Sequence, residues 1–232
     1  HSRHWEEKYM IKCLILDLDG TAVDTVASLA YSVNQVIERL GLTAQSEEKF
    51  NYYAGDGARN MFMRCLSDAG DPDHKKLEEA LSIYPGVFEN GCIYKVRAYD
   101  GLSDALRTIK SKGIKLAVFT NKAQLNADKV IRTVYGDLID LVLGESDRFE
   151  RKPCPDGALW IAEQFQAAPA ECLYVGDTNT DMKTGLSAGM ITCGVTWGFR
   201  ERKELEAFHP DYIIDEASTL ISIVEERNKE HG

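Results

Sequence analysis

The sequence predicts an α/β protein with a doubly wound, Rossmann-like parallel-sheet core and an inserted α-helical cap. The apolar run at residues 13–16 indicates a strand buried on both faces. Residues 24–95 show helical spacing only, whereas from residue 97 onward short apolar strands alternate with helical patterns, which is typical of a parallel sheet covered by helices. We therefore assign residues 10–23 and 96–228 to the core and residues 24–95 to the cap, and leave residues 1–8 out of the fold.

The expected cap helices span residues 25–40, 47–53, 58–69 and 73–94. Asp24 or Thr25 is suited to cap the first helix, and Gly41 to end it. Pro85 and Gly86 predict a kink or a break in the last one, because proline removes a helical hydrogen bond. No strand is expected between residues 24 and 95, so the segment is predicted to be a helical bundle inserted just after the first strand.

The core repeats a strand-then-helix pattern. Its expected strands are residues 13–16, 115–119, 141–143, 172–175, 191–195 and 212–214. Its expected helices are residues 102–112, 123–135, 156–165, 181–188, 203–208 and 218–226. Such alternation predicts parallel strands joined by crossover helices.

Composition narrows the functional class. A formal net charge of -10 argues against a protein that binds nucleic acid through its backbone phosphates. The six cysteines form no C-x-x-C pair and predict small buried side chains in a reducing, cytoplasmic protein. With no apolar stretch of about 18 residues and no signal-peptide pattern, neither a membrane span nor secretion is expected.

Polar residues follow the predicted strands at the edge of the sheet where ligands bind in doubly wound folds. These residues are Asp17, Asp19, Thr120, Asn121, Lys152, Asp177 and Asp181. The carboxylates of Asp17 and Asp177, together with Asp181 as a direct or an indirect ligand, offer the oxygen donors that Mg²⁺ prefers. A carboxylate could attack a phosphate in line, a second carboxylate could move the proton, and Thr120, the amide of Asn121 and Lys152 could hold the phosphoryl group.

These motifs, taken in order, resemble those of the haloacid dehalogenase superfamily. They are DLDGT at residues 17–21, Thr120-Asn121 after a strand, Lys152 in RKPCPD, and GDTNTD at residues 176–181. Within the superfamily, the chain is similar to phosphoglycolate phosphatase-like hydrolases, whose helical cap follows the first motif. The resemblance covers nearly all of residues 10–226.

The resemblance implies a role for each matched residue. Asp17 would be the nucleophile and a Mg²⁺ ligand, and Asp19 would be the general acid and base and would also bind Mg²⁺ through its backbone carbonyl. Thr120 and Lys152 would hold the phosphoryl group, while Asp177 would bind Mg²⁺ with Asp181 beside it.

The resulting prediction is a Mg²⁺-dependent phosphatase that acts on a small phosphorylated metabolite, with phosphoglycolate as the first substrate to test. The alternatives are a phosphomutase similar to β-phosphoglucomutase and a noncatalytic protein that binds a phosphorylated ligand. We expect no nucleic-acid or membrane partner, and a monomer or a homodimer.

Three short stretches outside the motifs have two interpretations each. Gly55, Gly57 and Arg59 precede or begin a cap helix and could bind the substrate's leaving group, or form an ordinary turn. Tyr52 and Tyr53 could line the same cleft or pack in the cap, with one of the two expected in the core. Trp197, Gly198 and Arg200 could border the site or form a loop without a role in it.

Overall fold

The computed structural model describes residues 9–229 and contains a six-stranded parallel sheet with the strand order β5-β4-β1-β6-β7-β8. The strands are β1 (Cys13–Leu16), β4 (Lys115–Ala123), β5 (Leu141–Glu145), β6 (Cys172–Gly176), β7 (Ile191–Val195) and β8 (Tyr212–Ile214). The chain leaves β1 toward β4 and β5, then crosses to β6 and continues to β8, so the strand order reverses beside β1. The predicted doubly wound α/β fold is confirmed.

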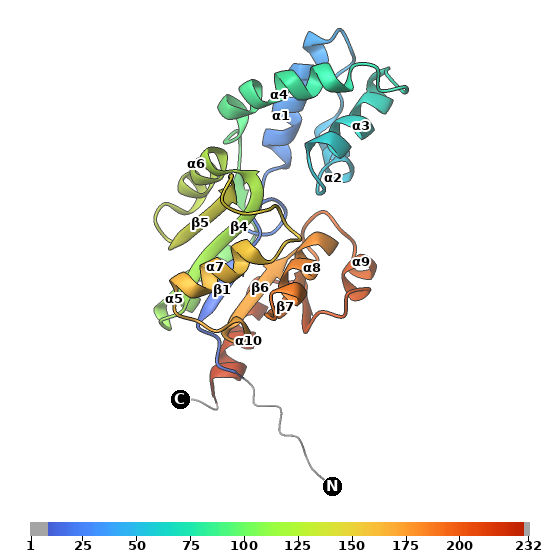
Figure 1. Cartoon of the computed structure of the whole chain (residues 1–232). Coiled ribbons are helices and arrows are strands. Elements are labelled where there is room, and N and C mark those ends of the chain that lie inside the picture. Colours follow the sequence, from blue (N-terminus) through green and yellow to red (C-terminus); the bar gives the residue numbers. More distant parts are fainter. Residues whose placement is uncertain (1–8, 230–232) are drawn as a thin grey trace.

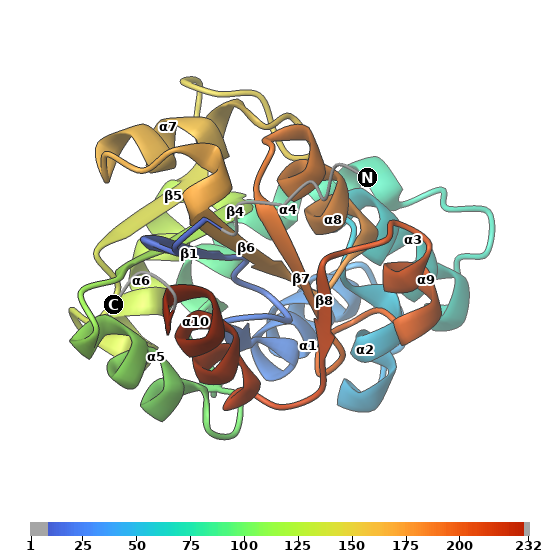
Figure 2. The ribbon, with the colours of Figure 1, turned by 90° about the horizontal axis from the view of Figure 1, so that it is seen from below.

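Helices cover both faces of this sheet (Figure 2). Leu14 and Leu16 of β1 pack in one cluster with α5 (Leu102–Ser111), α6 (Gln124–Tyr135) and α10 (Thr219–Lys229). Cys13 and Ile15 pack in the other cluster with α7 (Asp156–Gln164). The other helical elements of the core are the 3₁₀ turn η2 (Pro169–Glu171), α8 (Asn179–Ser187) and α9 (Arg202–Glu206). Because alternate residues of a strand face opposite sides, a fully apolar run was needed to bury β1 on both.

The segment at residues 24–95 stands beyond the carboxyl ends of the strands (Figure 1). Its elements are α1 (Val26–Arg39), the 3₁₀ turn η1 (Glu47–Lys49), α2 (Phe50–Tyr53), α3 (Ala58–Ala69) and α4 (Leu77–Gly91). We call this segment the cap. It is joined to the core by a small antiparallel ribbon of β2 (Val23–Asp24) and β3 (Arg97–Ala98).

Two details of the cap differ from the expectation. Asp24 belongs to a strand, although no strand was expected from residue 24 onward; its carboxylate still accepts a hydrogen bond from the Val26 amide at 3.2 Å. The helix α4 runs through Pro85 without a break. Pro85 and Gly86 are exposed, whereas Tyr84, Val87 and Phe88 are buried. Packing of the opposite face therefore holds the helix together, while the carbonyl group that loses its partner can bind water.

No helix within residues 9–229 has both the length and the apolar character that crossing a bilayer requires.

Candidate active site

Strand register brings the predicted site residues to one edge of the sheet. Leu16, the last residue of β1, is aligned with Val118 of β4 and Val175 of β6. The residues that follow these three positions therefore emerge together: Asp17 after β1, Thr120 near the end of β4, and Asp177 after β6. This edge lies beside β1, where the strand order reverses, as expected for a ligand site in a doubly wound sheet.

Three carboxylates form a cluster at this edge. Asp17, Asp177 and Asp181 each offer an oxygen atom, and these oxygens all lie within 4.8 Å of one another. Asp181 reaches the cluster because it lies in the first turn of α8. There its Oδ2 accepts hydrogen bonds from the Thr178 hydroxyl at 3.0 Å and the Asp177 amide at 3.2 Å. Helix capping thus fixes the third carboxylate of the cluster.

Lys152 supplies the positive charge of the cluster. Its ammonium group donates to Asp17 Oδ1 at 2.9 Å, to Asp181 Oδ1 at 3.0 Å and to the Phe119 carbonyl at 3.1 Å, which occupies all three of its protons. The Asn121 side chain accepts from the Lys152 amide at 2.9 Å and donates to the Lys152 carbonyl at 3.2 Å. Asn121 was expected to bind substrate through its amide, and its side chain holds the backbone of Lys152.

The charges of the cluster are only partly balanced. Burial raises the pKa of Asp17 well above its usual range, the charge of Asp181 adds to the shift, and Lys152 opposes it. Burial and the charge of Asp181 also raise the pKa of Asp177 to about 7. Burial disfavours the ammonium form of Lys152, but Asp17 and Asp181 outweigh that effect and raise its pKa well above the usual value. Three carboxylates against one ammonium leave an excess of negative charge that a divalent cation would neutralise.

Asp177 is held by two segments far apart in the sequence. Its Oδ1 accepts from the Thr21 hydroxyl at 2.9 Å, and its Oδ2 accepts from the Phe199 amide at 2.8 Å. A Cβ atom at Gly20 or Gly198 would come within 2.2 Å or 2.3 Å of that Oδ2. Only glycine allows the backbone to approach the carboxylate so closely. Of the two interpretations of Trp197, Gly198 and Arg200, the approach of Gly198 to Asp177 supports the one in which this loop borders the site.

Asp19 lies apart from the three-carboxylate cluster. Its Oδ1 accepts a hydrogen bond from the Thr25 hydroxyl at 2.6 Å and forms an ion pair with Lys122 Nζ at 3.2 Å. The Lys122 ammonium also lies over the ring of Phe88, a residue of α4 in the cap, at 4.3 Å from the ring centre. Sequence reasoning missed Lys122, although it directly follows Thr120 and Asn121.

Thr120 is buried, and its hydroxyl oxygen accepts from the Lys122 amide at 3.1 Å. This bond uses the oxygen as an acceptor and leaves the hydroxyl proton to donate elsewhere. The expected role of Thr120, donation to a phosphoryl oxygen, is compatible with this geometry and stays a prediction.

The cap residues predicted to bind substrate are placed differently from one another. Arg59 is exposed and forms an ion pair with Glu78 at 2.8 Å within the cap, so its guanidinium is not directed at the carboxylate cluster. The loop at Gly55 instead meets Arg200 of the core, because a Cβ atom at Gly55 would lie 2.9 Å from that guanidinium. Gly57 has open space around it.

The two tyrosines that precede this loop differ in burial. Tyr53 is fully buried, as expected for one of the pair, whereas Tyr52 is 72% exposed. Tyr53 therefore packs in the cap, and Tyr52 does not.

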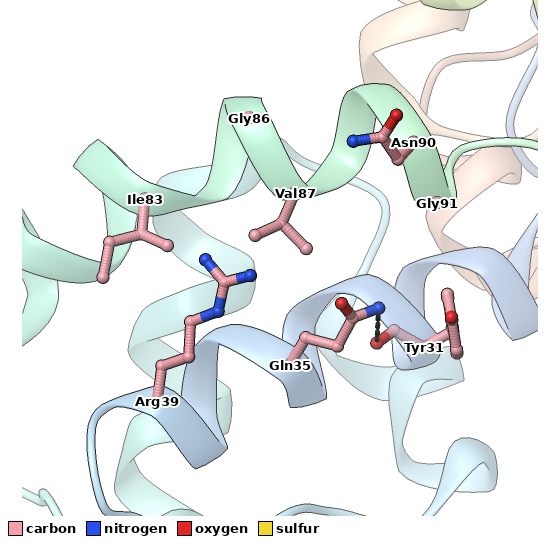
Figure 3. Close-up of a pocket in the computed structure, with 8 residues that line it drawn as sticks. All are labelled: Tyr31, Gln35, Arg39, Ile83, Gly86, Val87, Asn90 and Gly91. Atoms are coloured by element: carbon pink, nitrogen blue, oxygen red, sulfur yellow. Dashed lines mark hydrogen bonds between the residues drawn. The ribbon is translucent and has the colours of Figure 1, made fainter.

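A separate pocket of about 220 Å³ lies between α1 and α4 (Figure 3). It is lined by Tyr31, Gln35, Arg39, Ile83, Gly86, Val87, Asn90 and Gly91. In Figure 3 the Arg39 side chain extends from α1 toward α4, and the Gln35 amide donates to the Tyr31 carbonyl at 3.3 Å. None of the predicted catalytic or metal-binding residues lines this pocket.

Known proteins with similar sequences are named as phosphatases. The chain is 30% identical over 217 residues to a phosphoglycolate phosphatase from Nitrosospira multiformis, an alignment that covers 91% of this chain and 96% of the relative. It is 27% identical over 214 residues to a phosphoglycolate phosphatase from Pseudomonas putida, covering 90% of this chain and 78% of the relative.

Solved structures share the fold of this chain. A crystal structure of a phosphoglycolate phosphatase candidate from Lactobacillus delbrueckii superposes with a TM-score of 0.84 at 25% identity and covers 93% of this chain and 98% of that one. A β-phosphoglucomutase candidate from Thermotoga maritima, with a TM-score of 0.72 and 20% identity over 93% of this chain and 99% of that one, shares the fold.

The model of the haloacid dehalogenase-like hydrolase family matches residues 14–195, which include every predicted catalytic and metal-binding residue. Together with the phosphatase relatives, this match confirms the predicted enzyme class, a phosphoric monoester hydrolase. The chain belongs to the haloacid dehalogenase-like hydrolase family.

Proposed function

We propose that this protein is a Mg²⁺-dependent phosphatase that hydrolyses a small phosphomonoester through a phosphoaspartyl intermediate on Asp17. The observation that supports it best is the position of the Asp17 carboxylate. It lies at the carboxyl end of a central strand, 2.9 Å from a buried ammonium group and within 4.8 Å of two further carboxylates. Such a site can attract a phosphate through a cation and hold a nucleophile beside it.

The residues present fit Mg²⁺. The carboxylates of Asp17, Asp177 and Asp181 provide only oxygen atoms as ligands. Burial makes their excess negative charge more costly, which favours the binding of a cation. We propose that these three side chains, with the backbone carbonyl of Asp19, hold the ion, Asp181 directly or indirectly. When bound, Mg²⁺ would neutralise charge on the carboxylates and on the phosphate.

In the first proposed step, an Asp17 oxygen attacks the phosphorus atom, and the bond between phosphorus and the ester oxygen breaks. Asp19 donates a proton to that departing oxygen, which leaves as an alcohol. In the second step, Asp19 takes a proton from water, the water oxygen attacks the phosphorus atom, and the bond to Asp17 breaks. In both steps Thr120 donates to a phosphoryl oxygen, and the Lys152 ammonium, which donates to Asp17, Asp181 and the Phe119 carbonyl, balances the negative charge of the phosphoryl group.

We propose phosphoglycolate as the substrate, because the relatives at 27–30% identity are named for it. A monomer or homodimer in a reducing compartment such as the cytoplasm stays our prediction, and the absence of disulfides among the six cysteines supports that compartment.

The test is phosphate release from a panel of phosphomonoesters, with Mg²⁺ and with EDTA. Replacing Asp17 by Asn should lower kcat by on the order of 10⁴-fold or more, because an amide cannot form the intermediate. Asp128, an exposed residue of α6, provides the matched control: Asp128→Asn should keep wild-type activity. Phosphate release by Asp17→Asn at the wild-type rate would rule out the mechanism, and isomerised sugar phosphate without free phosphate would indicate a mutase.

A further inference from the structure

The ammonium group of Lys122 has unused hydrogen-bonding capacity. The side chain is only 6% exposed, yet among residues 9–229 its ammonium has a single polar partner, Asp19 Oδ1 at 3.2 Å. The Lys152 ammonium, on a side chain that is 4% exposed, donates to three oxygen atoms. An ammonium carries three protons, so Lys122 retains donors for a further acceptor. A buried cation with unfilled donors is costly unless a ligand fills them.

Lys122 also lies where a substrate's leaving group would be. The proposed proton donor, Asp19, must approach the ester oxygen, and Lys122 contacts Asp19 on one side. On the other side it faces the cap through the Phe88 ring at 4.3 Å, and Phe88 stacks on Tyr84 with ring centres 5.1 Å apart. The phosphoryl end is assigned to Lys152 and Thr120. The remaining part of a substrate therefore extends toward Asp19, Lys122 and the cap.

The other polar groups near Lys122 do not supply a second anion. Burial raises the pKa of Tyr84 well above its usual value, and the charge of Asp19 adds to this, so the phenol stays neutral. The Cys92 thiol is also kept neutral, because burial raises its pKa although Lys122 and Lys129 oppose the shift. A ligand anion is therefore suited to accept from the free donors of Lys122.

We propose that Lys122 determines specificity by binding an anionic group, such as a carboxylate, on the leaving group of the substrate. This inference rests on the proposed phosphatase function and narrows it to small phosphomonoesters with an acidic leaving group. Phosphoglycolate has this chemistry, and the structure assigns its carboxylate a partner that the motifs of the sequence did not include.

The test compares two substrates that differ only in the charged group. Phosphoglycolate and ethyl phosphate both have two carbon atoms and one phosphate, but only the first carries a carboxylate. The readout is the ratio of their kcat/KM values with Mg²⁺ present. Lys122→Met should lower this ratio by on the order of 10- to 100-fold, the worth of a hydrogen bond to a charged group. Lys122→Arg, which keeps the positive charge, should retain most of the wild-type ratio.

Lys129 is the matched control. It also reaches the cap from the core, donating to the Glu89 carbonyl of α4 at 3.2 Å, but it does not contact Asp19. Lys129→Met should leave the ratio unchanged. Thermal melting of each variant shows whether the fold is retained.

Each outcome decides the matter. An equal loss on both substrates in Lys122→Met would mean that Lys122 only positions Asp19, and would overturn the proposal while the phosphatase function stands. Equal wild-type rates on the two substrates would do the same. A wild-type protein that hydrolyses neither would refute the proposed substrate class, and one that hydrolyses no phosphomonoester at all would refute the proposed function as well.

Discussion

At the scale of the residue, the cost of placing three carboxylates together should be measurable as a dependence of the protein's stability on pH. Burial and Asp181 raise the pKa of Asp177 from 3.8 to about 7 in the folded, metal-free protein. The folded state therefore binds this proton more tightly than the unfolded state does. The stability that protonation contributes is present at low pH and is lost as the pH rises from about 4 to about 7.

We expect Mg²⁺ to reverse this loss, because it binds the deprotonated carboxylates. At a concentration of about 100 times its Kd, Mg²⁺ should raise Tm by about 5 to 10 °C near pH 8, and by much less near pH 5.5. Thermal melting with and without Mg²⁺ at the two pH values measures this. In Asp177→Asn the difference between the two pH values should shrink, whereas the exposed Asp128→Asn control should behave as wild type. An equal Mg²⁺ effect at both pH values in wild type would contradict the expectation.

Single residues also show what the sequence could predict. The gathering of Asp17, Asp177 and Asp181 was predictable, because strand register aligns the ends of neighbouring strands and because buried like charges are costly unless a cation lies between them. The hydrogen-bond partners of Asp177 were not predictable, since one of them is the backbone amide of Phe199, and every residue type except proline carries such a donor. Lys122 was missed for a different reason: its significance depends on contact with the cap, which no local pattern encodes.

At the scale of the element, α1 and α4 approach each other closely at Gly91. A Cβ atom there would lie 2.2 Å from Ser32 Oγ of α1. This hydroxyl is buried and has no hydrogen-bond partner among the described residues. The packing of α1 against α4 thus requires glycine at position 91, and it leaves the Ser32 hydroxyl without a hydrogen-bond partner.

We expect Gly91→Ala to lower the free energy of unfolding by about 1 to 3 kcal/mol, because the added methyl group overpacks the contact. Ser32→Ala should be neutral or stabilising, since it removes an unpaired hydroxyl. The double variant should recover part of the loss caused by Gly91→Ala, because it removes the clashing atom. Denaturant unfolding of the four proteins measures these values, and strictly additive effects would show that the two residues are not in contact.

Elements were predicted well where one local pattern decided them, as in β7 and β8, whose bounds agree with the expectation. The expected break at Pro85 does not occur in α4, because the pattern records Pro85 but not the buried contacts of Tyr84 and Phe88 that keep the helix continuous. The prediction also ended β4 at Phe119, whereas the strand continues irregularly to Ala123 through a shift of register against β5. Tertiary packing overrode the local signal in both cases.

At the scale of the whole molecule, the cap meets the core on two sides of the carboxylate cluster. On one side Lys122 and Lys129 reach α4. On the other side Arg200 donates to the Ala54 carbonyl at 3.3 Å and forms an ion pair with Asp56 at 3.6 Å. The Arg200 contacts are linked to the carboxylate cluster through the chain itself, because the preceding residue, Phe199, donates to Asp177.

We expect Arg200→Met to lower kcat/KM by about 10-fold, because the variant loses contacts that hold the cap over the site and exclude water. The Arg200 side chain is 15% exposed, so these contacts are only partly screened. Arg202→Met is the matched control: its ion pair with Asp215 is well exposed and lies outside the cap contact, so activity should not change. Steady-state kinetics should be accompanied by a Mg²⁺ titration. Both variants keep the backbone amide of Phe199, so a change in Mg²⁺ affinity would report a displaced loop and not a missing donor. Unchanged Mg²⁺ affinity with reduced kcat/KM would assign Arg200 to cap closure, whereas a parallel loss of Mg²⁺ affinity would mean that Arg200 acts by holding the loop around Asp177.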